Sequence, residues 1–276
     1  MNYMGKDGFV WFQGVVEDRM DPLYLGRCRI RCLGFHTEDK TKIPTASLPW
    51  AMPVQPITSA AMSGIGQSPI GPVEGTWVMG FFRDGMNAQE PVFFGTIGGI
   101  PSDVVNTGKG FSDPSGTYPK QELVNEQDTN RLARGISADT IVQSKVEATE
   151  GHKEHPTANE AGDDKWSEPD VPFAAKYPKN HVYESESGHI QEFDDTDGAE
   201  RIHTYHKAGT FEEIHPDGSK VVKVVGDDYE LLLGKKFVHI SGNVNVVVDG
   251  QSTFYVKGDS DIQVDGNVKQ VVGGNV

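Results

Sequence analysis

Cysteine is scarce in this sequence, and the two that occur are poorly placed for a disulfide. Cys28 and Cys32 lie in a run where apolar and basic residues alternate as in a strand. The alternation puts both cysteines and Ile30 on one face and the neighbouring arginines on the other. Residues four apart in a strand are separated by about 13 Å, whereas the Cα atoms of a disulfide lie within about 7 Å. We expect two small core residues of a protein made in the cytosol, with a metal site as the weaker alternative.

Long apolar runs and an excess of basic residues are also missing. No apolar stretch approaches 18 residues, so no membrane-spanning helix is expected. Residues 1–12 lack the basic and apolar regions of a signal peptide. The 276 residues include 25 Lys and Arg against 40 Asp and Glu, a net charge of −15. Because phosphate contacts need clustered basic residues, nucleic acid is not an expected partner.

Regularly spaced glycine is what the sequence does have. Eight of its 32 glycines follow one another at intervals of eight residues, and such a short fixed period indicates a repeat architecture. An aliphatic residue stands two positions before each of these glycines from the second onward. The octad glycines are Gly218, Gly226, Gly234, Gly242, Gly250, Gly258, Gly266 and Gly274. The aliphatic residues are Val224, Leu232, Ile240, Val248, Val256, Val264 and Val272.

Each octad predicts one short strand followed by a glycine that bends the chain or takes a positive φ. Apolar residues recur at every second position, as at Val244, Val246 and Val248. Eight extended residues reach roughly 26 Å, too little to wind around a core as well. One chain therefore leaves its apolar face and both strand edges open. Three chains would close them, which predicts an obligate homotrimer with an intertwined triple-stranded β-helix, its core formed by the aliphatic stripe.

Two other repeat structures fit the glycines less well. A flat β-meander would require the strict spacing to arise by chance. A calcium-binding solenoid needs a nine-residue period with paired glycines and a regular aspartate, and the sequence has neither.

The chain divides into four regions and is predicted to be all-β. Short strand-like runs separated by turn residues over 1–100 suggest an OB-type Greek-key barrel, with a long loop over 37–68 as a binding surface. Residues 101–180 are polar and rich in Gly and Pro, which predicts an extended linker that could include a short helix over 138–149. Less regular strand units over 181–217 form a neck. The octads over 218–276 form a needle.

Histidine pairs are the one hint of other chemistry. His203 and His206 lie three residues apart, so in a strand they point to opposite faces and are badly placed to share a metal. His152 and His155 fall in the linker. We interpret both pairs as surface histidines. No nucleophile elbow or phosphate-binding glycine motif is present. No catalytic, cofactor-binding or metal-binding residue is therefore expected.

Several motifs together resemble a known family. They are residues 14–23, 25–27, 48–50, 55–66, 71–76 and 94–96 near the N-terminus, and 186–189, 194–196, 200–203, 205–207 and 215–218 in the neck. These runs, with the octads, resemble the baseplate central spike protein of contractile-tailed phages. That family is also called the baseplate hub subunit and tail lysozyme, and it is related to VgrG spikes.

The resemblance implies a trimeric, structural cell-puncturing spike in the tail baseplate of a virion, made in the host cytoplasm. It further implies that the OB barrel docks on a trimeric baseplate hub protein. A small conical PAAR-like tip protein would sit at the far end of the needle, and the spike would pierce the host outer membrane when the sheath contracts.

The sequence departs from the best-known members of the family at the lysozyme domain. Only about 80 residues join barrel and needle. They contain Glu122, Glu126 and Glu147 but no periodic apolar helices to position such acids across a sugar cleft. We therefore expect no enzymatic activity. A peptidoglycan-degrading tail lysozyme, a VgrG-like secretion spike and a receptor-binding tailspike remain alternatives. The sequence ends at Val276 in mid-octad, which leaves open a shortened chain or a needle capped by another polypeptide.

Overall fold

A computed structural model describes residues 9–60, 65–68, 70–98, 153–157, 165–170 and 172–274. Within these ranges the chain is built from strands and turns, with two short 3₁₀ turns, η1 (Thr45–Ser47) and η3 (Gly85–Asn87). The all-β prediction is confirmed. In this described part, no helix has the length and apolar character that crossing a bilayer requires. The helix expected over 138–149 lies outside the described residues.

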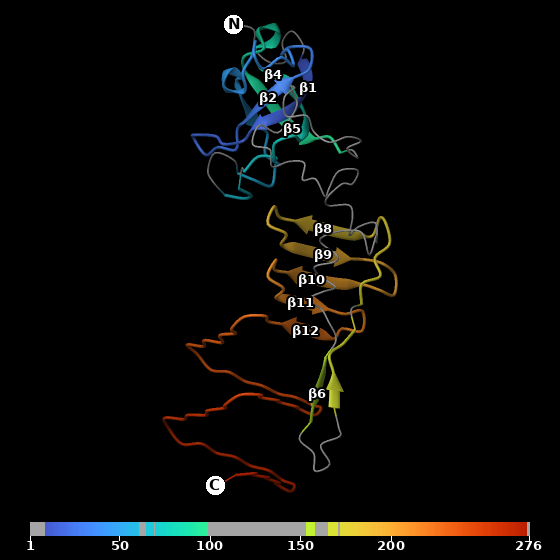
Figure 1. Cartoon of the computed structure of the whole chain (residues 1–276), viewed down its shortest axis with the longest axis vertical. Coiled ribbons are helices and arrows are strands. Elements are labelled where there is room, and N and C mark those ends of the chain that lie inside the picture. The colour runs from blue at the N-terminus through green and yellow to red at the C-terminus, as the bar shows by residue number, and fades with distance from the viewer. Residues whose placement is uncertain are drawn as a thin grey trace. The chain divides into compact units, whose positions relative to one another are not determined.

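Five strands close into a barrel in the order β1-β2-β3-β5-β4. All neighbours are antiparallel except β3 and β5, which are parallel. This confirms the OB-type barrel, which Figure 1 shows in blue and green. The strands are β1 (Val10–Asp18), β2 (Cys28–Cys32), β3 (Trp50–Pro53), β4 (Trp77–Phe82) and β5 (Pro91–Thr96).

The barrel core is formed by alternate residues of these strands, because successive side chains point to opposite faces. Phe12, Val16, Cys28, Ile30, Cys32, Val78 and Phe82 are among its members. Both cysteines are buried and free, as expected, and burial raises the pKa of the Cys28 thiol to about 12. Gly80 lies at a close approach of two strands, since a Cβ there would stand 2.2 Å from the Val92 carbonyl oxygen.

A second sheet is an antiparallel meander in the order β12-β11-β10-β9-β8. Its strands are β8 (Asn180–Glu184), β9 (Ile190–Asp194), β10 (Arg201–Tyr205), β11 (Phe211–Ile214) and β12 (Lys220–Lys223). Gly188, Gly209 and Gly218 close three of its turns with φ of 87°, 107° and 84°, a left-handed conformation that favours glycine. Gly218, the first octad glycine, thus lies in the β11–β12 hairpin, and the sheet runs to Lys223, past the limit at 217 that the sequence suggests.

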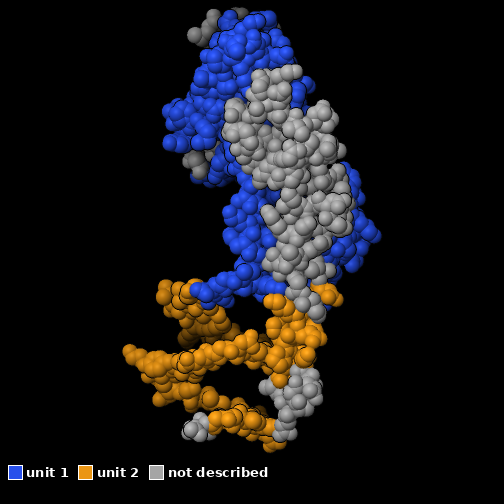
Figure 2. Space-filling model, viewed as in Figure 1, with its two compact units in different colours: residues 1–150, 171–228 blue, residues 151–170, 229–276 orange. Residues whose placement is uncertain are grey.

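The chain separates into two compact units, which Figure 2 colours blue and orange. Unit 1 comprises residues 1–150 and 171–228, and it contains the barrel and the meander sheet. Unit 2 comprises 151–170 and 229–276. It includes a short hairpin of β6 (Glu154–Pro156) and β7 (Lys165–Ser167), in which the rings of His155 and Trp166 stack at 4.5 Å.

Residues 224–274 run as extended segments separated by bends, and the bends recur every eight residues. Each bend falls on an octad glycine and the residue before it, from Val225–Gly226 to Gly273–Gly274. Within the single chain, no residue of 224–274 belongs to a paired strand. Figure 1 shows this stretch as one unpaired trace, from orange to red. The octad glycines after Gly218 therefore act as bends without a left-handed φ.

Candidate assembly surfaces

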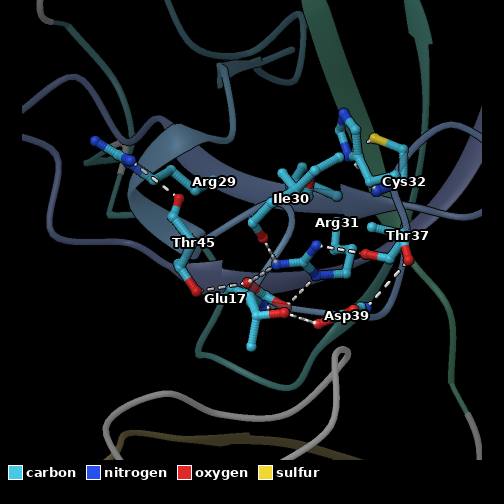
Figure 3. Close-up of polar contacts among 11 residues, drawn as sticks. Glu17, Arg29, Ile30, Arg31, Cys32, Thr37, Asp39 and Thr45 are labelled. Atoms are coloured by element: carbon cyan, nitrogen blue, oxygen red, sulfur yellow. Dashed lines mark hydrogen bonds and ion pairs between the residues drawn. The ribbon is translucent and has the colours of Figure 1, made fainter.

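A buried ion pair fastens the β2–β3 loop to the barrel (Figure 3). Arg31 donates from Nε and Nη2 to the two Glu17 carboxylate oxygens at 2.7 and 3.0 Å, and both side chains are wholly buried. Arg31 also donates to the carbonyl oxygens of Thr37 at 2.6 Å and Ile43 at 2.9 Å. The Thr45 hydroxyl donates to Glu17 at 2.7 Å. The loop over 37–45 is therefore a fixed part of the barrel surface.

The surroundings of Glu17 favour its charged form. Burial by itself raises the pKa of Glu17, but hydrogen bonds from Arg31 and Thr45, with the Arg31 charge, lower the pKa overall. Strand alternation correctly puts Arg31 on the face opposite the cysteines. It gives no sign that this side chain is buried, because charged residues in strands usually face water.

The β1–β2 loop is organised around the buried carboxylate of Asp21. That carboxylate accepts hydrogen bonds from the backbone N–H groups of Leu23 and Leu25 at 3.0 and 2.8 Å, and from the Arg27 guanidinium at 2.6 Å. The Arg27 hydrogen bond is the largest cause that lowers the pKa of Asp21 far below its usual range. Tyr24 takes a left-handed φ of 57°, and the loop exposes Met20, Leu23, Tyr24 and Leu25. A preorganised loop with an apolar tip suits protein contact.

The outer face of β1, β4 and β5 carries a cluster of exposed aromatic rings. Trp11 packs edge-on against Phe81 and Phe94 with centroid distances of 5.6 and 5.9 Å, and Phe9 lies 5.3 Å from Phe81. Phe9, Trp11 and Phe94 remain about half exposed. Contiguous exposed aromatic side chains are typical of protein-binding surfaces.

The buried face of the meander sheet holds a polar network beside its apolar core. Arg201 donates to Glu213 at 2.5 Å and to Glu192 at 2.8 Å. Glu192 also lies 2.9 Å from His203 Nδ1 and accepts from Asn180 at 2.9 Å. Burial opposes the charge of Glu192, yet bonds from His203 and Asn180 and the Arg201 charge hold its pKa below the ordinary value.

One sequence interpretation is wrong here. His203 is not a surface histidine but is completely buried, because it shares the inward phase of Arg201 and Tyr205 along β10. His206, directly after the end of β10, is exposed. Within the described ranges, no group of three or more His, Cys, Asp or Glu side chains could hold a metal ion.

The aliphatic octad residues lie along the extended trace and are not brought together by the chain itself. Their exposed fractions range from 37% at Val224 to 55% at Leu232. Around each of the glycines from Gly226 onward, a Cβ would meet nothing within 4 Å. The space-filling view shows the orange stretch as a thin chain with open space between its successive passes (Figure 2). All seven aliphatic side chains of this stripe are thus partly exposed in the single chain.

The fold defines the class of protein: an all-β protein in which an OB-type barrel is followed by a β-meander and an octad-repeat segment. The Gp5 N-terminal OB domain family matches residues 34–172, half of the chain. The chain belongs to this family, that of the baseplate central spike proteins of phages.

Two relatives extend the comparison. The chain is 49% identical over 273 residues to Protein Gp5 of Vibrio phage KVP40, an alignment that covers 88% of this chain and 64% of the relative. It is 53% identical over 130 residues to the pre-baseplate central spike protein Gp5 of Enterobacteria phage T4, covering 45% of this chain and 22% of that protein. The chain thus spans less than two thirds of the length of either relative.

Proposed function

We propose that the chain is the structural spike of a phage tail baseplate, a homotrimer whose octad segments wind into a triple-stranded β-helix. The observation that carries the proposal is the open aliphatic stripe from Val224 to Val272. Apolar surface of this extent is unfavourable in water, and unpaired strand edges invite pairing with other chains. Three copies would bury the stripe and pair the edges. The name of the T4 relative supports a location in the baseplate of the virion.

The proposed action is mechanical. Strands from three chains would hydrogen-bond to one another along the whole needle, so that withdrawing one chain breaks many bonds together. Such a structure unfolds slowly and resists compression. Sheath contraction would then drive the needle through the host outer membrane.

The barrel offers two surfaces for the proposed trimeric hub protein: the aromatic cluster around Trp11 and the apolar tip of the β1–β2 loop at Tyr24. Both expose large apolar side chains on a rigid support, the feature that binding sites between proteins share. A small PAAR-like tip protein at the far end of the needle completes the proposed assembly.

We propose no enzymatic role. The buried carboxylates of Glu17, Glu192 and Glu213 are each held by an arginine, which suits structure and not proton transfer. The acids Glu122 and Glu126 lie outside the described residues, as does Glu147. A peptidoglycan-clearing assay with the full chain tests this point, and we expect no clearing. Clearing above that of a heat-denatured sample of the same protein would favour the tail-lysozyme alternative.

Electron microscopy of tails tests the proposed position. An antibody raised against residues 243–266 should label the tail axis below the baseplate, at the tip. Label on the tail fibres or the sheath would contradict a central spike. An antibody against the barrel provides the control, because it should bind nearer to the baseplate or be blocked by the hub.

A further inference from the structure

The even-numbered face of the octad segment changes character along its length. This face carries all seven aliphatic stripe residues. From Val238 to Val272 it has no charged residue at all. Its charges are confined to the start of the segment, at Asp228, Glu230 and Lys236. The even-numbered face is therefore uncharged over residues 238–272, and its only charged residues lie where the octad segment begins.

Two of these charges meet in the structure. Lys236 Nζ lies 2.5 Å from both carboxylate oxygens of Glu230. The two residues belong to successive octads, and the chain bends between them at Leu233 and Gly234. Both side chains are about half exposed in the single chain. An ion pair this exposed adds little to the stability of a single chain. We therefore ask what the pair would do in the proposed trimer.

The octad repeat leaves the assembly with a problem of register. If one chain slid along its neighbours by eight residues, Val248 would take the place of Val256 and glycine would still meet glycine. The aliphatic stripe therefore cannot distinguish the correct stagger from a shifted one. A unique charged layer can, because a chain shifted by one octad would bury the Glu230 carboxylate against Val222 or Val238 of its neighbours.

We propose that Glu230 and Lys236 from three copies of this chain form a charged layer that sets the axial register of the needle. The layer begins seven residues after the end of β12, near the start of the octad segment. This inference rests on the proposed trimer and adds to it the residues by which the copies recognise one another.

The rival placement turns the even face outward in this octad, so that Tyr229 and Leu231 point to the needle axis. Exposure in the single chain favours our assignment. Tyr229 is 77% exposed and Leu231 88%, against 55% for Leu232 on the even face. Charge reversals on the even face separate the two placements, because they disturb assembly only if that face is buried.

The test measures register by disulfide cross-linking in the full chain. Chains with Val248→Cys are refolded together with chains carrying Val256→Cys and then oxidised. In-register trimers cross-link like with like, whereas chains shifted by one octad cross-link position 248 of one chain to position 256 of another. The native cysteines are buried in the barrel and give the same background in every sample.

The cross-linking is repeated in three variants and compared with the wild type. The variants are Glu230→Lys, Lys236→Glu, and the double variant that carries both reversals. Each single reversal should lose the like-with-like cross-link, through shifted or failed assembly, and the double reversal should restore it. Asp249→Lys, on the odd face, is the matched control and should keep the in-register product.

The outcomes distinguish failure of the proposed charged layer from failure of the proposed trimer. If the wild type is trimeric and both single reversals behave like Asp249→Lys, the charged layer is wrong and the trimer stands. If the single reversals fail and the double reversal does not recover, the pairing of Glu230 with Lys236 is wrong. If the wild type is monomeric by mass, the proposed function fails, and this inference with it.

Discussion

Arg31 and Glu17 form a two-pronged ion pair that is wholly removed from water, with N–O distances of 2.7 and 3.0 Å. Removing one partner leaves the other charge buried and alone, which costs about 3–5 kcal/mol. We expect Glu17→Gln and Arg31→Met each to lower the free energy of unfolding of the barrel by this amount. Hydrogen exchange of the β1 and β2 amides measures it.

The control for this pair is Arg83 with Glu90, an exposed pair at 3.3 Å on the same barrel. Glu90→Gln should change stability by about 0–1 kcal/mol. Equal effects of Glu17→Gln and Glu90→Gln would show that the buried pair does not hold the β2–β3 loop.

The barrel should lose stability in acid. The carboxyls of Glu17 and Asp21 have pKa values below their ordinary range. As the pH falls through about 4, the unfolded chain takes up protons at these groups before the folded barrel does, so the contribution to stability present at neutral pH is lost there. Denaturant unfolding from pH 7 to pH 3 measures this, and Asp21→Asn should flatten the curve. If the free energy of unfolding of Asp21→Asn fell with pH as steeply as that of the wild type, Asp21 would not be a source of the acid sensitivity.

The buried network of the meander sheet provides a matched comparison between neighbours. Glu213 faces inward and binds Arg201, whereas Glu212 faces outward and pairs with Lys220 at 2.8 Å. Glu213→Gln should destabilise the sheet by about 3–5 kcal/mol and Glu212→Gln by about 0–1 kcal/mol. Thermal unfolding of the two variants side by side checks the difference, and equal values would refute the inward role of Glu213.

Two barrel glycines should respond differently to alanine. A Cβ on Gly80 would stand 2.2 Å from the Val92 carbonyl oxygen and 2.5 Å from the Phe12 ring, whereas a Cβ on Gly95 meets nothing within 4 Å. Gly80→Ala should cost about 1–3 kcal/mol through overpacking, and Gly95→Ala about 0.5 kcal/mol or less. The denaturant midpoints of unfolding of the two variants measure this difference. If Gly80→Ala unfolded at the wild-type midpoint, β4 and β5 would separate at this position without cost.

Much of this architecture follows from local patterns in the sequence. Alternation of apolar residues places the barrel strands, and the turn glycines mark the hairpins of the meander, because both signals depend on neighbours along the chain. The glycine ladder likewise places the bends from Gly226 to Gly274.

The buried polar pairs depend instead on residues far apart in the sequence. Glu17 and Arg31 are 14 residues apart, and the register of β1 against β2 shifts between Val16 and Asp18, at Glu17. Alternation cannot foresee such a shift. For His203 the sequence does contain a signal. This histidine shares the phase of Tyr205 in β10, so strand alternation predicts that both side chains are buried.

Adjacent residues of one octad test which face is buried in the needle. Val256→Asp would place three carboxylates near one axis, and several kcal/mol of unpaired buried charge would prevent or weaken assembly. Tyr255→Asp, one residue away on the odd face, should keep the wild-type resistance to heat and detergent. If Val256→Asp kept it as well, the aliphatic stripe would not be the core.

The molecular mass of the purified full chain under native conditions tests the trimer most directly. Native mass spectrometry or sedimentation should give three times the 30.2 kDa chain mass, without a concentration-dependent monomer. A monomer of 30.2 kDa that stays soluble with its aliphatic stripe exposed would contradict the account.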